Sequence, residues 1–298
     1  MAELFDRYEK ALAKRFGEVR GVVSTSGAML VPRTLEADTI SVSGALHAET
    51  LRGNLVEVSG SLSVAKDAVV GVMEVSGSVR VRGSLEADEA HVSGSLDVGE
   101  CRVRDSLYLS GSLRSRGGVT ARYAEISGGC SVSGEFCAEE AEVSGGLKAS
   151  RVTGDRWRVS GSIKTEGDVR INDLEIELYG VSRVNGIIAG RTVKVRRGKR
   201  ARFCKVSMLL DIISRLSVAR YFEVWRLPST RAKLSCKGIE AEEVYIEGVE
   251  CDYVKGRIVV IGPGSVVRKR VVYSGKLEID PEAKVEGEII EVEGPEQS

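Results

Sequence analysis

The stretch VSGSVRVRGSLEADEAH, residues 75–91, decides the fold, because the chain repeats it at nearly constant spacing. The Val-Ser-Gly start or a close variant recurs eight times, at steps of 16 or 17 residues. A period this short accommodates one small supersecondary unit that stacks on its neighbours, and not a helix pair or a propeller blade. The glycines of these starts are Gly44, Gly60, Gly77, Gly94, Gly111, Gly128, Gly145 and Gly161.

Alignment of the copies shows apolar columns with the two-residue alternation of a strand facing a core. In the copy quoted above, Val79 and Val81 form one pair, Leu85 and Ala87 a second, and Ala90 leads into the next start. Three short strands per turn predict an all-β fold, a parallel β-helix of triangular section with about 17 residues per coil. Crossovers between parallel strands favour a right-handed coil. We expect each repeated glycine to mark a corner with a positive φ.

Composition agrees with a narrow core and limits the classes of partner. Aromatic residues make up only 5% of the 298 residues, and 43 basic residues balance 43 acidic ones. A chain without a global basic field is not expected to bind nucleic acid along its length. The absence of a signal peptide and of a long apolar run predicts a cytoplasmic protein, in which the six cysteines are small buried hydrophobes.

The pattern divides the chain into five segments. Residues 1–20 have helical spacing and predict an amphipathic helix, either a cap on the first coil or an anchor. The main β-helix is expected over 21–190, a basic amphipathic insertion over 191–235, a second set of about three looser coils over 236–290, and a disordered acidic tail over 291–298. The 19-residue steps from Ile239 to Ile258 and Leu277 suggest the looser coils.

The insertion concentrates positive charge that the neutral total conceals. Residues 191–235 hold 13 Lys or Arg and only two acidic residues. Part of this segment has a helical apolar face, flanked by basic and aromatic residues, as in helices that bind anionic membrane surfaces. Packing along the solenoid, a subunit interface and nucleic-acid binding are the alternatives. The candidate contact residues are Arg196, Arg197, Lys199, Arg200, Arg202, Met208, Leu209, Ile212, Ile213, Leu216, Phe222 and Trp225.

We find no sequence pattern that indicates catalysis or a cofactor. The chain has two histidines, His47 and His91, whereas a zinc site of the carbonic anhydrase kind needs three. A six-residue acyltransferase repeat, a Walker loop, GxSxG and HExxH are also missing from the sequence. We therefore expect no catalytic, metal or cofactor-binding residues, and a protein that is not an enzyme.

A glycine-punctuated 17-residue β-helix resembles the bactofilins, a family of polymer-forming cytoskeletal proteins. The stretches around 240–247, Ile261-Gly262-Pro263-Gly264, Tyr273-Ser274-Gly275 and 280–285 look like the longer branch of that family. The resemblance implies β-helices that join end to end into filaments and often attach to membrane as scaffolds. The expected function is thus self-assembly, with itself and an anionic membrane as partners; the alternative is a discrete oligomeric scaffold that binds a protein or anionic partner through the basic insertion.

Overall fold

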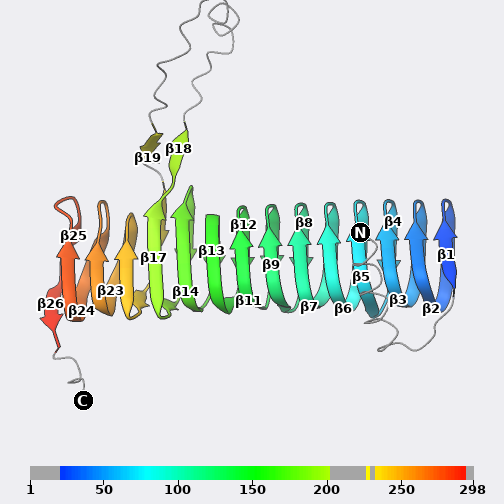
Figure 1. Ribbon diagram of the computed structural model, residues 1–298, viewed down its shortest axis with the longest axis horizontal. Helices are drawn as coiled ribbons and strands as arrows, with labels where there is room; N and C mark the ends of the chain where they lie inside the picture. Colours follow the sequence, from blue (N-terminus) through cyan, green and yellow to red (C-terminus); the bar gives the residue numbers. More distant parts are fainter. Residues whose placement is uncertain (1–20, 202–225, 229–231, 293–298) are drawn as a thin grey trace, which may run out of the picture.

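A computed structural model describes residues 21–201, 226–228 and 232–292 of the chain. These residues form a long parallel β-solenoid of about 14 turns, with about 17 residues in each turn. Figure 1 shows the coils stacked side by side along one axis, from β1 at one end to β26 at the other. The predicted helices over 1–20 and within the insertion lie outside the described residues.

The first half of the solenoid contains strands that run through one, two or three sides of a coil. Their bounds are β1 (Val22–Thr25), β2 (Ala28–Val42), β3 (Ala45–Val58), β4 (Ser61–Val64), β5 (Ala68–Val75), β6 (Ser78–Val92), β7 (Ser95–Leu109), β8 (Ser112–Ser115), β9 (Val119–Ile126), β10 (Gly129–Val132), β11 (Glu135–Val143), β12 (Gly146–Ala149) and β13 (Arg151–Thr165).

The second half continues with the same geometry and carries one antiparallel arm. Its strands are β14 (Val169–Leu178), β15 (Val181–Val184), β16 (Ile187–Ala189), β17 (Thr192–Arg197), β18 (Lys199–Ala201), β19 (Arg226–Pro228), β20 (Lys233–Ser235), β21 (Gly238–Glu240), β22 (Glu243–Ile246), β23 (Val249–Ile261), β24 (Val266–Ile279), β25 (Lys284–Val285) and β26 (Glu288–Glu291).

Each coil has three faces, which we name from the coil between residues 61 and 75. Face A is the strand segment that follows the Val-Ser-Gly corner, here 61–64; face B follows it at 68–70, and face C at 72–75. Equivalent residues of successive coils pair in parallel, as Leu62 does with Val79 and Val79 with Leu96. The faces are therefore continuous sheets that run the length of the rod, as the repeat predicted.

The core is one row of side chains per apolar column, enclosed by the three sheets. Buried Leu, Val, Ile and Ala dominate it, and the alternation of buried and exposed residues along β8 and β10 matches the predicted columns. Two large rings interrupt this pattern: Phe136 and Trp157 are buried and pack edge to face, 5.3 Å between ring centroids. Trp157 fits because Gly154 leaves space beside it, where a Cβ would overlap the indole.

The coils after the insertion continue the same axis. Strands β15, β16 and β17 pair in parallel with β20, β21 and β22 in turn, and Ile188 lies opposite Ile239. The 19-residue spacing proved not to mark equivalent positions, because Ile239 pairs with Val254 on face B whereas Ile258 belongs to face C. The coils here are shorter and less regular, so a fixed step could not find their register.

Candidate interaction surfaces

The corner glycines form a ladder along the edge where face C turns into face A. The prediction that they have positive φ was wrong: among the described residues, positive φ occurs only at Gly21, Gly248 and Gly264. The corner glycines are needed instead because successive coils approach closely there. A Cβ on Gly77 would collide with the carbonyl oxygen of Gly60, and a Cβ on Gly94 with that of Gly77, both well inside 3.0 Å.

This ladder sets the pitch of the rod at one edge. Ser78 N donates to Gly60 O at 3.0 Å, and Ser95 N donates to Gly77 O at 3.0 Å, so each corner carbonyl accepts a hydrogen bond from the next coil. A side chain at the corner would push these coils apart and break those bonds. The repeated glycines are thus part of the stacking surface and have no ligand-binding geometry of their own.

The basic insertion leaves the rod at the same edge. The antiparallel pair of β18 and β19 projects beyond the corners of the neighbouring coils (Figure 1), between the end of β17 and the start of β20. Of the candidate contact residues, Arg196 and Arg197 lie in β17, and Lys199 and Arg200 in β18. The other eight lie outside the described residues.

Arg196 and Arg197 point to different surroundings. Arg196 is exposed, with its guanidinium over the Tyr245 ring at 5.4 Å and 4.0 Å from a Glu175 carboxylate oxygen. Arg197 is half-buried, and its Nη2 donates to Gly264 O at 3.4 Å. Its Nε is buried without a hydrogen-bond partner in the described part of the chain.

The Arg197 side chain passes between two turns that only glycine can form. Gly248 and Gly264 both have φ of +67°, and a Cβ on either would overlap the arginine. The backbone N–H of Arg197 also donates to Glu247 Oε2 at 3.2 Å. Arg197 therefore ties the base of the insertion to the coils that follow it, a role that the sequence gave no signal for.

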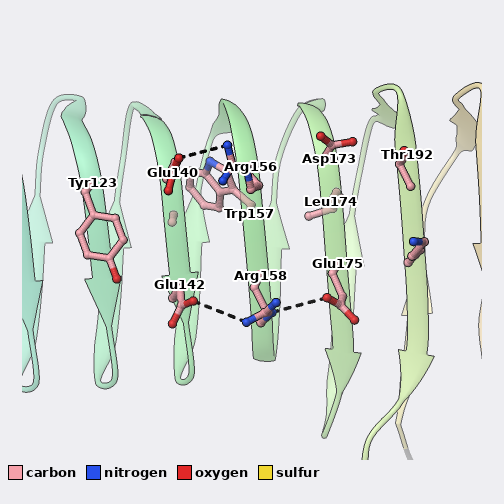
Figure 2. Close-up of a pocket in the computed structure, with 12 residues that line it drawn as sticks. Tyr123, Glu140, Glu142, Arg156, Trp157, Arg158, Asp173, Leu174, Glu175 and Thr192 are labelled. Atoms are coloured by element: carbon pink, nitrogen blue, oxygen red, sulfur yellow. Dashed lines mark hydrogen bonds and ion pairs between the residues drawn. The ribbon is translucent and has the colours of Figure 1, made fainter.

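A shallow groove crosses five coils on face C, from β9 to β17, and its walls are charged (Figure 2). Arg158 lies between Glu142 and Glu175, with contacts of 3.6 and 3.5 Å, and Arg156 lies 3.3 Å from Glu140. These pairs join neighbouring coils, so they alternate in sign along the rod axis. Exposed pairs of this kind contribute little individually, but they neutralise the face.

Titratable groups around this groove are perturbed by their neighbours. A hydrogen bond from Arg191 lowers the pKa of Asp173, which keeps that carboxylate ionised. Partial burial, followed by the negative charge of Glu125, raises the pKa of Tyr123. At the N-terminal side of the groove, Tyr108 stacks on His91 with ring centroids 4.8 Å apart. The groove is thus a partly aromatic charged surface whose carboxylates are largely engaged by arginines.

Both ends of the described solenoid carry apolar side chains on strands that pair on one side only. At the first end, Val22 and Leu30 are 74% and 75% exposed, and β1 pairs only with β2. At the other end β26 pairs only with β24. The exposed residues there are Ile279, Ile289, Ile290 and Val292. Unpaired strand edges beside apolar side chains favour further strand pairing.

Neither a metal site nor a membrane-spanning helix is found in the described ranges. Among those residues, no three His, Cys, Asp or Glu side chains lie together in a way that could hold a metal ion. No helix in this part of the chain has the length and apolar character needed to cross a bilayer.

Comparison with known proteins gives no relative: no family model, curated protein or solved structure matches the chain.

Proposed function

We propose that this chain is a non-enzymatic structural protein, a self-assembling cytoskeletal scaffold of the bactofilin type. It works in the cytoplasm, can associate with the inner face of the membrane, and has the right-handed coil that the crossover rule predicts. The likeness that motivates this proposal is the glycine-punctuated repeat with its tail motifs, and the solenoid fold is compatible with a scaffold.

The observation that carries the proposal is the state of the two ends. Val22 and Leu30 at one end and Ile289 and Ile290 at the other are exposed, next to backbone edges that pair on one side only. Since every coil presents the same three-sided cross-section, an end of a second copy can continue the sheets and cover the apolar residues. Association through ends alone generates filaments, because such contacts do not close into a ring.

Negative-stain electron microscopy over a range of protein concentration tests this function. We expect filaments from the intact chain. The double variants Val22→Asp with Leu30→Asp, and Ile289→Asp with Ile290→Asp, should shorten or abolish them, because each places charge in an apolar junction. Val181→Asp is the matched control: Val181 is 58% exposed but lies in the middle of the rod, so its replacement should leave filaments intact.

A second candidate function rests on the projecting arm. The β18–β19 pair extends from the rod next to a strongly basic stretch of sequence, and it offers a site at which a discrete oligomer binds a protein or anionic partner. Particles of one fixed size, present at all concentrations and unchanged in both double end variants, would reject the filament and support this alternative.

A further inference from the structure

Face A carries a row of positive charges in the middle of the rod. Lys148, Lys164 and Arg183 occupy equivalent positions in three successive coils, where each pairs directly with the next in the parallel register. Arg114 occupies the same column two coils earlier, with Ser131 between it and Lys148. All four side chains are exposed, and none has an ion pair with another described residue.

Elsewhere on the rod, the charges of neighbouring coils mostly alternate in sign. Arg104 lies 2.8 Å from Asp88, and Lys269 lies 2.8 Å from Asp252, each pair spanning two coils. Like charges directly opposite each other on paired strands are destabilising. The row of cations on face A therefore works against the stability of the isolated rod, which points to a role outside it.

The other two faces of the same coils do not share this bias. From β8 to β15, face A holds four basic and no acidic outward residues. Face B of these coils balances Glu135 and Asp168 with Arg151 and Arg170. Face C carries the paired Arg and Glu side chains of the groove described above. The positive field is thus directed to one side of the rod.

The surface beside the cations is low and open. A shallow trough runs along face A across β7, β8, β10, β12 and β13. Its floor consists of small residues, Ser95, Ser112, Gly129, Gly146 and Ser162, so nothing next to the cations stands above them. Basic side chains that extend furthest from a flat, rigid face can all reach one plane together.

We propose that face A, through Arg114, Lys148, Lys164 and Arg183, is the side of the rod that lies on an anionic lipid surface. This inference rests on the proposed membrane association and says which side of the scaffold makes the contact. Clusters of four or more Lys or Arg are attracted to anionic headgroups. A planar bilayer fits a flat face, and mobile headgroups need not match the coil spacing. Exposed Val181, on face A one coil edge from Arg183, adds an apolar contact.

Vesicle co-sedimentation of the full-length chain tests the inference. The vesicles contain one third phosphatidylglycerol in phosphatidylcholine, and vesicles of phosphatidylcholine alone serve as the neutral surface. The test variant is Lys148→Glu with Lys164→Glu and Arg183→Glu. Since each cation near an anionic surface contributes roughly a factor of five, we expect binding to weaken at least 100-fold. Raised salt should weaken binding of the intact chain in the same direction.

The matched control makes the same change in net charge on another face. Arg52, Arg151 and Lys255 are exposed on face B and have no ion pair among the described residues. Their joint replacement by Glu should leave vesicle binding within a few-fold of the intact chain. Equal loss in the two triple variants would show that binding follows net charge only, and unchanged binding in the face A variant would also overturn the inference.

Two further arms separate the other occupants and the underlying function. Glu57 and Glu74 pair directly on face C without ion partners, so a second copy could supply the counter-charge; lateral bundling that needs Lys164 but occurs without lipid would favour that occupant and reject lipid. Binding of a single-stranded oligonucleotide, lost in the face A variant while vesicles bind neither protein, would favour nucleic acid.

Loss of vesicle binding with filaments intact in electron microscopy supports the face A assignment within the scaffold function. Vesicle binding by all proteins, abolished only by Leu209→Asp with Ile213→Asp, would place the membrane contact in the insertion and overturn face A. Absence of filaments with face A binding intact would reject self-assembly alone, so the two proposals fail separately.

Discussion

Replacement of a corner glycine by alanine should destabilise the rod far more than the same replacement on an open face. In Gly77→Ala the new Cβ collides with Gly60 O, a backbone atom that cannot rotate away. The coil must shift, which strains the bonds from Gly77 N to Val58 O at 3.1 Å and from Ser78 N to Gly60 O at 3.0 Å. Two lost hydrogen bonds at about 1–1.5 kcal/mol each lower the free energy of unfolding by about 2–3 kcal/mol.

Gly129→Ala is the matched control, because Gly129 lies on face A with nothing within 4 Å of the position of its Cβ and without a positive φ. Alanine at a compatible site restricts the unfolded chain and stabilises by about 0.4–1 kcal/mol. The two alanine variants should therefore differ by about 3 kcal/mol in urea unfolding followed by far-ultraviolet circular dichroism.

The effect should also be local, since each coil contacts only its neighbours. Hydrogen exchange should speed up at the amides of Ser78 and Ser95, which donate to the corner carbonyls, and remain unchanged several coils away. Equal urea midpoints for Gly77→Ala and Gly129→Ala would refute the reasoning, because they would show that the corner tolerates a side chain.

Two further predictions concern buried side chains that break the repeat. Gly154→Ala should destabilise the intact protein by about 2 kcal/mol but much less in a Trp157→Ala background, because the added Cβ collides only with the indole and with the Ala138 carbonyl; urea unfolding of the four proteins measures this coupling, and additive losses would contradict it. Burial raises the pKa of the Cys101 and Cys130 thiols to about 12, so at pH 8 a thiol reagent should label neither of them before denaturant is added. Because these folded-state pKa values lie above the unfolded value of about 8.5, stability is unchanged below pH 8 and falls as pH rises above about 9; stability that increases there would contradict the burial argument.

The repeat alone was sufficient to predict the coil and its faces. A column such as Leu62, Val79 and Leu96 recurs at the coil length, and strand geometry leaves one way to bury it. It could not identify the reason for the glycines, because a positive φ and a close approach of backbones both select glycine. Only the positions of Gly60 O and Gly77 in space distinguish the two causes.

Irregular coils were harder to predict for the same reason. After the insertion the equivalent positions are 15, 16 or 18 residues apart, as in Leu234 with Val249 and Val266 with Lys284, so no constant step identifies them. The sequence did show that the insertion is basic, but not that Arg197 turns inward against Gly264. That contact joins residues 67 positions apart, and nothing local in the chain encodes it.

The sequence by itself determined the class of fold, the coil length and the composition of the core, since these depend on a periodicity that is visible in one dimension. The tertiary structure decided which side chains from successive coils lie next to each other. Stacking placed Lys148, Lys164 and Arg183 in one row, although they are 16 and 19 residues apart in the chain. It also set the apolar ends of the rod at Leu30 and Ile289. A charge pattern across coils arises only when the register of every coil is fixed, because a shift of one residue moves a side chain from solvent to core.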